Sequence, residues 1–182
     1  MSDAGADEDA AEPEGAEQSV APPEPERRYG ALVHRSGDVD VLHATREQLL
    51  DVVRAMHDDG YVMCLDVTAV DYLVHPGRDL PAGIEPERFE VVVTLISHRD
   101  RVRQRLRVQV PADDPTCPSL FALHPGTEAL EREVYDMFGI TFTDHPDMTR
   151  ILMPEDWVGH PLRKDYDSGR IPVQFKGAPS VR

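Results

Sequence analysis

The most informative stretch of the chain reads Glu131-Arg132-Glu133-Val134-Tyr135-Asp136-Met137-Phe138-Gly139-Ile140. Short runs of similar character follow it: His145-Pro146-Asp147, Arg150-Ile151-Leu152, Pro154-Glu155-Asp156-Trp157, Gly159-His160-Pro161-Leu162 and Arg163-Lys164-Asp165-Tyr166. Charged residues, prolines, glycines and aromatic residues are concentrated there, which leaves few positions for a separate hydrophobic core. Such a ribbon is better suited to lie against another protein than to close around a small molecule.

The first part of this stretch is predicted to be a helix. Thr127 is in position to cap it, and Gly139 is in position to end it. Its apolar face is expected to consist of Leu130, Val134, Met137 and Phe138. Glu131, Glu133 and Asp136 are then expected to flank the opposite face. Beyond Ile140 the sequence has no usable periodicity, so no further regular element is predicted.

The segment before this helix alternates between strand and helix patterns. Strands are predicted over residues 29–33, 39–42, 61–70, 88–97 and 101–110, with a proline-rich loop over 75–86. Thr45 and Gln48 form a capping-box pattern before a helix that Gly60 ends. A short helix is predicted over 119–123. This order predicts an α+β fold with a mostly antiparallel sheet and helices on one face, followed by an extended C-terminal arm.

The strand over residues 101–110 has the clearest alternation in the chain. Its polar face carries Arg101, Arg103, Arg105 and Arg107. Its apolar face carries Val102, Leu106, Val108 and Val110, with Gln104 as the one exception. Strict alternation predicts one face on the core and one face in solvent or on a partner. The arginine face is therefore either a solvated surface or a surface for an acidic partner.

The charge distribution separates an N-terminal segment from the rest of the chain. The 182 residues include 34 acidic and 19 basic residues, giving a net charge of −15. Residues 1–26 hold nine of the acidic residues and none of the basic ones, so residues 27–182 carry −6. Low hydrophobicity with high charge predicts disorder for residues 1–26. The acidic balance argues against a nucleic-acid partner. The sequence also predicts no transmembrane segment and no secretory signal.

Cofactor-binding patterns are missing from the sequence. The two cysteines, Cys64 and Cys117, are far apart and suggest neither a disulfide framework nor a zinc or iron–sulfur site. There is also no glycine-rich nucleotide loop. His145, Asp147 and His160 are the candidates for a metal site, which would make the protein a stand-alone metal-dependent hydrolase. Their long spacings on predicted loops are not those of a typical metal site.

Acidic and basic residues alternate closely through the ribbon. Glu131, Glu133 and Asp136 could act as acid and base in catalysis if burial raised a pKa, but the nearby basic residues favour an ion-pair network. That network would hold the C-terminal arm to the domain or to a neighbouring protein. Arg163 is expected to pair with a carboxylate across an interface, or with one of those three carboxylates. Trp157 is expected to be a packing anchor or an interface hot spot.

The ribbon from about Leu130 to Tyr166 resembles the signature of the 30-kilodalton subunit, or C subunit, of the proton-pumping NADH:quinone oxidoreductase, respiratory complex I. The resemblance implies a domain over residues 27–138 and an arm over residues 139–182 that docks on partner subunits. The signature positions expected at the interface are Glu131, Arg132, Glu133, Asp136, His145, Pro146, Asp147, Arg150, Trp157, His160, Arg163, Lys164, Asp165 and Tyr166.

The same resemblance implies a role without chemistry of its own. The complex passes electrons from NADH through FMN and iron–sulfur clusters to a quinone and pumps protons, while this chain would bind no cofactor and carry no catalytic residue. It would lie peripherally on the cytoplasmic side of the cell membrane. There it would pack on the large D subunit, which forms much of the quinone cavity, with the B and I subunits nearby. The abundance of arginine over lysine indicates a GC-rich bacterial genome, and an actinobacterium-like source would use menaquinone. The matching subunit of a membrane-bound hydrogenase or a related dehydrogenase is the alternative.

Overall fold

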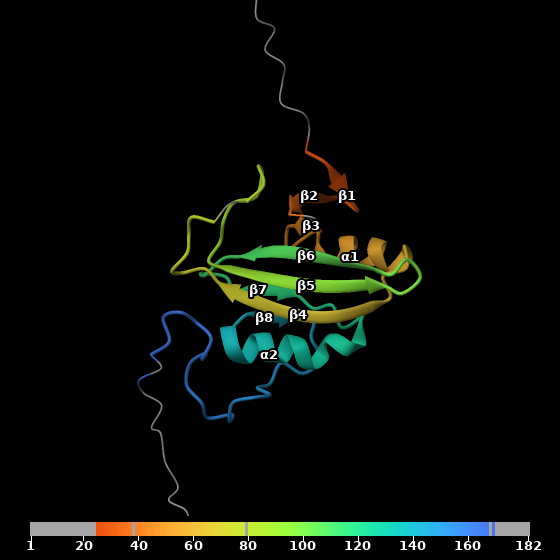
Figure 1. Ribbon diagram of the computed structural model, residues 1–182. Coiled ribbons are helices and arrows are strands. Elements are labelled where there is room, and N and C mark those ends of the chain that lie inside the picture. Colours follow the sequence, from red (N-terminus) through yellow and green to blue (C-terminus); the bar gives the residue numbers. More distant parts are fainter. Residues whose placement is uncertain (1–24, 38, 79, 168, 170–182) are drawn as a thin grey trace, which may run out of the picture.

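The computed structural model describes residues 25–37, 39–78, 80–167 and 169 (Figure 1). Its main element is a six-stranded sheet with the order β1-β2-β3-β6-β5-β4, accompanied by a separate pair, β7–β8. The strands are β1 Arg27–Arg28, β2 Ala31–Ser36, β3 Val39–Ala44, β4 Met63–Asp71, β5 Phe89–Ser97, β6 Val102–Val110, β7 Thr116–Pro118 and β8 Thr141–Thr143. The helices are α1 Leu49–Asp58, the 3₁₀ turn η1 Pro125–Thr127 and α2 Glu128–Phe138.

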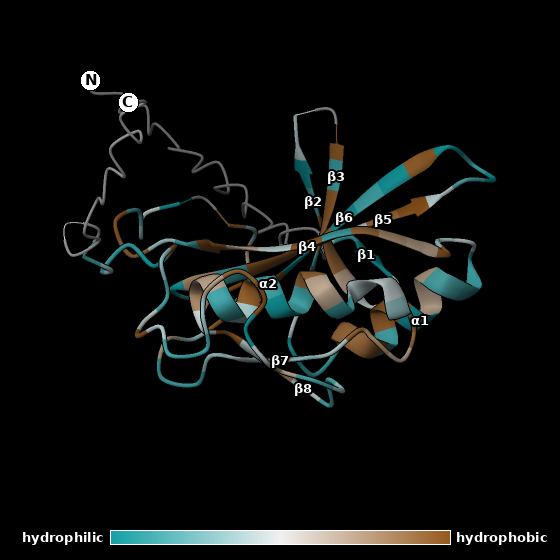
Figure 2. Ribbon diagram, turned by 90° about the horizontal axis from the view of Figure 1, so that it is seen from below, coloured by the Kyte–Doolittle hydropathy of each residue, from teal (hydrophilic) through white to brown (hydrophobic). Residues whose placement is uncertain are grey.

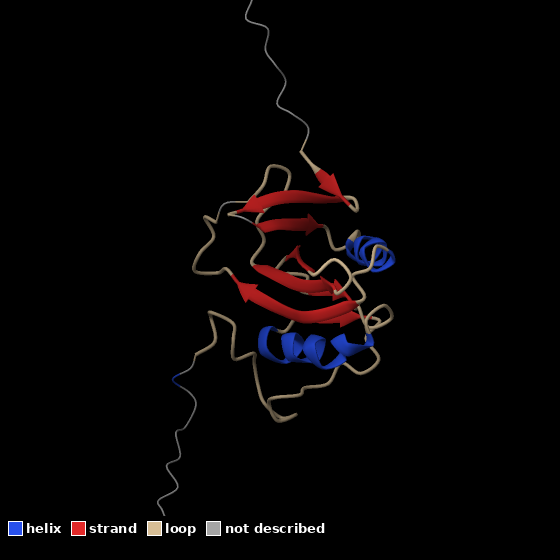
Figure 3. Ribbon diagram, turned by 45° about the vertical axis from the view of Figure 1, so that its right-hand side comes forward, coloured by secondary structure: helices blue, strands red, loops and turns tan. Residues whose placement is uncertain are grey.

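The helices lie on one face of the large sheet. Figure 2 shows α1, α2, β7 and β8 on the same side of the fanned strands. Val91 and Val93 of β5 join Val53 of α1 and Val134 of α2 in one core cluster. Neighbouring strands of the large sheet are antiparallel except β3 and β6, which run parallel. The predicted α+β class, with a mostly antiparallel sheet and helices on one face (Figure 3), is therefore confirmed.

The predicted capping box is present at the entry to α1. The Thr45 main-chain N–H donates to Gln48 Oε1 at 3.2 Å, and the Gln48 N–H donates to Thr45 Oγ1 at 3.3 Å. These two bonds close the turn before the helix, which begins at Leu49. Gly60, with φ of +98°, follows the end of α1 in a conformation that glycine adopts most readily.

Strand β6 shows the predicted alternation over most of its length, but Val102, expected on the core face, is 43% exposed at the start of the strand. Leu106, Val108 and Val110 are fully buried in the core, while Arg103 and Arg105 are exposed. Gln104 lies on the apolar side and is buried there, and its side-chain amide donates to Asp40 O at 2.8 Å. The break in the pattern is therefore a satisfied polar group and not a change of face.

Two predicted features of the second half are wrong. Residues 119–123 form a turn and no helix, because Pro118 and Pro125 restrict the segment to fewer residues than a stable helix needs. The chain also continues as a strand beyond Ile140: β8 pairs in parallel with β7, and Phe142 is buried beside Cys117. The hydrophobic core therefore extends past residue 138.

The ends of the described region bear on the terminal predictions. The disorder predicted for residues 1–26 falls mostly on residues 1–24, which lie outside the described residues. Glu26, in contrast, accepts a main-chain hydrogen bond from Val33 at 2.9 Å and pairs with Arg28. The tail beyond Asp167 also lies outside, apart from Gly169. In the part of the chain that the structure describes, no helix is long and apolar enough to cross a membrane.

Candidate functional site

Several of the predicted signature residues meet at the C-terminal end of α2. Residues 144–167, here called the arm, leave β8 and return along α2 as an irregular segment (Figure 1). Four of the side chains that join the helix to the arm lie at this end, and with their main-chain partners they are called the clamp: Asp136, Arg150, His160 and Arg163. Three of these side chains come from the arm and one from the helix.

The arm caps the free carbonyl groups at the end of α2. The Leu162 N–H donates to Met137 O at 3.0 Å, and Arg163 donates through Nε to Phe138 O. The His160 ring nitrogen Nδ1 lies 3.0 Å from Asp136 O. The last carbonyls of a helix have no partner within it, and a cation placed there also interacts favourably with the helix dipole. The arm thus supplies the polar groups that α2 lacks.

Gly139 makes this close approach possible. It ends α2 in the left-handed conformation, with φ of +72°, as the sequence predicted. A Cβ atom added at this position would lie 2.6 Å from Arg163 Nη2 and 2.6 Å from the His160 ring. Any larger residue would therefore be strained and would also push the arm away from the helix end.

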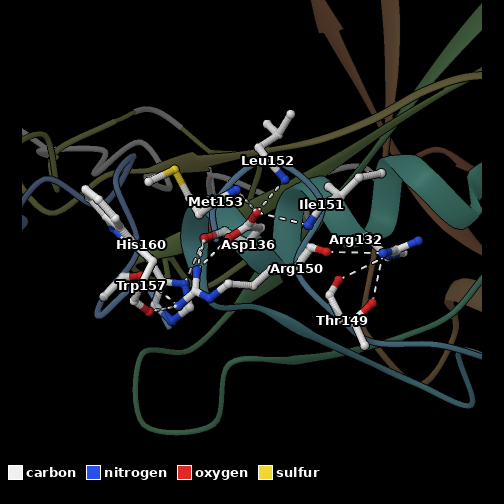
Figure 4. Close-up of polar contacts among 10 residues, drawn as sticks. Arg132, Asp136, Thr149, Arg150, Ile151, Leu152, Met153, Trp157 and His160 are labelled. Carbon is white, nitrogen blue, oxygen red and sulfur yellow. Dashed lines mark hydrogen bonds and ion pairs between the residues drawn. The ribbon is translucent and has the colours of Figure 1, made fainter. Parts of the chain in front are cut away.

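Asp136 is the centre of the clamp (Figure 4). Its side chain is fully buried, and Oδ2 accepts main-chain N–H groups from Ile151 at 3.1 Å, Leu152 at 2.8 Å and Met153 at 2.8 Å. Oδ1 pairs with the Arg150 guanidinium. Burial raises the pKa of Asp136, but the main-chain donors and Arg150 outweigh it, so the pKa lies below its usual value. The group is an ionised anchor and not a proton donor.

Two arginines fix the path of the arm around Asp136. Arg150 also donates to Trp157 O and Gly159 O, each at 3.0 Å, which closes the loop between these residues. Arg132 reaches from α2 to Thr149 O at 3.1 Å and Arg150 O at 3.1 Å. The predicted network holding the arm to the domain is thus present, and most of its acceptors are main-chain carbonyls.

Arg163 does not have the carboxylate partner expected within the chain. It binds Phe138 O and Gly139 O, and its guanidinium lies 5.2 Å from the centre of the Phe89 ring. Among the described residues, Glu131, Glu133 and Asp136 form no ion pair with it. Its position over the helix end explains this, because the nearest acceptors there are unpaired carbonyls.

Glu131 serves a different part of the fold. It is fully buried and accepts from Ser119 Oγ at 2.6 Å, Leu120 N at 2.8 Å and Thr127 Oγ1 at 2.8 Å. It lies on the same side of α2 as Val134, so its predicted place on the opposite face is wrong. Residues three apart on a helix are neighbours, and this spacing could have revealed it. Glu133 is exposed and has no described contact.

Several apolar side chains of the arm face outward. The large hydrophobic residues of the arm that remain exposed are Ile151 at 41%, Leu152 at 60%, Val158 at 87% and Leu162 at 48%. The main chain of Ile151, Leu152 and Leu162 is bound in the clamp, so these side chains are presented on a fixed backbone. Four large exposed apolar residues within twelve positions of one fixed segment make this segment a candidate protein interface.

Comparison with known proteins gives the family. The family model described as "Respiratory-chain NADH dehydrogenase, 30 Kd subunit" matches residues 42–171. The chain belongs to this family. That match includes the clamp and the arm.

Curated relatives in the 30 Kd subunit family are named as the C subunit of NADH-quinone oxidoreductase. The protein from Mycolicibacterium gilvum (strain PYR-GCK) is 45% identical over 150 residues, covering 81% of this chain and 62% of the relative. The protein from Saccharopolyspora erythraea is 45% identical over 140 residues, covering 75% of this chain and 53% of the relative. This chain thus spans 62% of the first relative's length and 53% of the second's, which is less than two thirds of either.

Two solved structures share the fold. The structure titled as the trypsin-resistant fragment (1-134) of Nqo5 has a TM-score of 0.58 and 34% identity, covering 65% of this chain and 89% of the fragment. The membrane-bound sulfane sulfur reductase, an archaeal respiratory membrane complex, contains a chain with a TM-score of 0.64 and 21% identity. That match covers 84% of this chain and 90% of the other, and at this identity it shows the fold alone.

A second attachment of the arm was not predicted from the sequence. In this member of the 30 Kd subunit family, buried Asp71 at the end of β4 accepts from the Lys164 N–H at 2.9 Å. Arg88 bridges Asp71 and Asp165, at 2.8 Å to each. Tyr166 packs over Gly159, where an added Cβ would lie 2.9 Å from the ring. An acidic residue that ends a buried strand was the one available signal for Asp71.

The residues proposed for a hydrolase are not assembled into a metal site. His145 Nε2 lies 3.1 Å from Glu128 O, and His145 Nδ1 accepts from the Asp147 N–H at 3.1 Å. His160 is bound to the end of α2 instead. Within the described ranges, no group of three His, Cys, Asp or Glu residues is placed to hold a metal ion. The geometry therefore gives the hydrolase alternative no support. Pro146 is exposed in the bend that follows His145.

Proposed function

We propose that this chain is a non-redox structural subunit of an NADH:quinone oxidoreductase, and that its arm is the docking element. The observation that carries the proposal is the clamp, which fixes the main chain of the arm while Leu152, Val158 and Leu162 remain exposed. Family membership over residues 42–171 supplies the complex in which such an element would act. The docking element begins after β8, because Ile140 and Phe142 belong to the core.

The two cysteines support a role without redox chemistry. Cys117 is buried, and burial raises its pKa to about 12. Burial also raises the pKa of Cys64 to about 11. Iron–sulfur clusters are held by several thiolates, and two widely separated protonated thiols do not fit that requirement. FMN, the clusters and the quinone, menaquinone in an actinobacterium-like organism, would be held by other subunits.

The proposed partners follow the family. The arm would pack on the D subunit, the large protein of the quinone site, with the B and I subunits nearby, on the cytoplasmic side of the cell membrane. The chain would act on quinone reduction indirectly, by keeping the protein that it contacts in one geometry. A corresponding subunit of another respiratory membrane complex is the second candidate, supported by the fold shared with the sulfane sulfur reductase chain.

Affinity purification of the full chain from solubilised membranes tests this proposal. We expect the tagged chain to bring down a complex that contains FMN, iron–sulfur proteins and NADH:quinone reductase activity. The double variant Leu152→Asp and Val158→Asp should lose the complex, because two carboxylates would be desolvated in an apolar contact. The control Val39→Asp and Val62→Asp changes exposed valines at 49% and 56% outside the arm and should retain it.

Each outcome of this purification is decisive. A complex that contains no FMN but shows another respiratory activity would favour the second candidate. If the Leu152 and Val158 variant retained the full complex, these exposed side chains of the arm would not be part of the interface. Circular dichroism of each purified variant separates loss of docking from loss of fold.

A further inference from the structure

The second face of the large sheet is covered over β2 and β3, where Leu32, Val41 and His43 are buried, but it is exposed over parts of β4, β5 and β6. The described helices and the β7–β8 pair lie on the other side (Figure 2). Strand register places Arg103 opposite Ile96, Arg105 opposite Thr94, and Val92 opposite Thr68. These six residues, Thr68, Val92, Thr94, Ile96, Arg103 and Arg105, are called the open face. All of them are exposed or half-buried, although β5 and β6 are central strands.

One exposed carboxylate, Asp66, lies opposite Thr94 on this face, but among the described residues it forms no ion pair with Arg103 or Arg105. Farther along β6, Arg107 lies 3.5 Å from the buried carboxylate of Glu90, which also has Arg78 nearby at 4.0 Å. Arg103 and Arg105 differ, because neither side chain has a hydrogen-bond or ion-pair partner in the described part of the protein. Two neighbouring unpaired guanidinium groups beside a stripe of β-branched residues form a surface for an acidic polypeptide.

The chain itself carries an acidic segment that precedes β1. Residues 1–24 contain eight acidic and no basic residues. They join the fold at β1, which is separated from β6 by β2 and β3 in the sheet. Three strand spacings amount to about 15 Å. A random coil of 24 residues has a root-mean-square span of roughly 27 Å, which exceeds this distance, so the length of the segment permits contact with β6. Of the two cations in β1, Arg28 is engaged by Glu26 and Asp40, whereas Arg27 donates to Gly30 O.

We propose that the acidic segment 1–24 binds the open face through Arg103 and Arg105. Tethering raises its effective concentration at this face to about the millimolar range, so weak ion pairs suffice. The contact is sensitive to salt, because exposed charges are screened over about 10 Å at 0.1 M salt. The segment thereby covers the arginine face against other acidic polypeptides. This inference is independent of the proposed function of the arm.

Amide NMR spectra of the full-length chain test the contact. One variant replaces the acidic residues at positions 3, 7, 8, 9, 12, 14, 17 and 24 with Asn or Gln, which removes the charge and keeps the length. At 20 mM NaCl we expect the amides of Thr68, Thr94 and Ile96 to differ between this variant and the unchanged chain. At 500 mM NaCl the difference should disappear. Identical open-face spectra at low salt would overturn the proposal.

A matched pair of variants tests whether the two arginines are the cause. Arg103→Gln with Arg105→Gln should abolish the salt-dependent shifts of the open face and of the acidic segment. The control Arg35→Gln with Arg54→Gln removes the same charge from exposed positions outside the open face and should preserve them. Equal loss of the shifts in both pairs would show a general effect of net charge and would overturn the specific contact.

Discussion

Replacing Asp136 with Asn is the most direct test of the clamp. The carboxylate is fully buried and receives three main-chain N–H groups and Arg150. Asn has nearly the same shape but offers one acceptor oxygen and places an NH₂ group where donors already point. If the amide oxygen takes the place of Oδ2, it keeps the three main-chain N–H groups of residues 151–153. The NH₂ group then faces the Arg150 guanidinium, which loses its buried counter-charge.

The expected loss is large for so small a change. Removing one partner of a buried ion pair costs about 3–5 kcal/mol. The arm, however, can detach without unfolding the sheet, so the loss falls first on the arm. A loss of about 3 kcal/mol corresponds to roughly a 100-fold decrease in the protection of the arm amides from hydrogen exchange.

Hydrogen exchange resolved by residue measures this loss. We expect the amides of Ile151, Leu152 and Met153 to exchange at least about 100-fold faster in Asp136→Asn, while Val91 and Val93 in β5 change little. The control Glu133→Gln alters an exposed carboxylate on the same helix and should leave all five amides unchanged. Protection of the arm within about threefold of the original would refute the role assigned to Asp136. An equal loss in β5 would refute the independence of the arm.

Three further changes test other parts of the structure. Arg163→Glu places a carboxylate against the carbonyl end of α2 and should release the arm of the isolated chain, with Arg163→Gln intermediate; equal hydrogen exchange of the arm in all three proteins would contradict the capping role. Gly139→Ala adds a Cβ at φ of +72° against Arg163 and His160. It should lower the melting temperature by several degrees, because the left-handed conformation alone costs about 1–2 kcal/mol. An unchanged melting temperature by calorimetry would contradict this prediction. Burial lowers the pKa of His43 to about 4, so the unfolded chain takes up a proton below about pH 6.5 before the folded chain does, and stability falls as the pH drops from 6.5 towards 4. His43→Leu should remove about 2 kcal/mol of that loss at pH 5 in urea unfolding, whereas the exposed control His75→Leu should not.

The sequence predicted the elements that depend on local patterns. The alternation over residues 101–110, the Thr45–Gln48 capping box and the glycine stop at position 139 all depend on neighbouring residues, and all are present. The parallel pairing of β3 with β6 joins segments that are about 60 residues apart, so no local pattern indicates it. Strand β8 is only three residues long, too short for periodicity to appear.

Several signature residues meet at the end of α2, but their hydrogen-bond partners differ from the expected ones. Sequence reasoning sought a carboxylate for Arg163, because side chains are the only polar groups that differ between positions. Main-chain groups occur at every residue and give no signal, although they are the partners of Asp136 and Arg163. The many charged residues of the signature therefore mark a segment without regular secondary structure, in which side chains supply the hydrogen-bond partners of main-chain groups.

The signature and the arm therefore contain two groups of residues with different roles. Asp136, Arg150 and Arg163 point inward and are bound to the main chain, so their substitution should act through the conformation of the arm. Leu152, Val158 and Leu162 point outward and are exposed, so their substitution should act on docking while the fold remains intact. A partner would therefore recognise the apolar side chains, and the buried charges would set the geometry in which those side chains are presented.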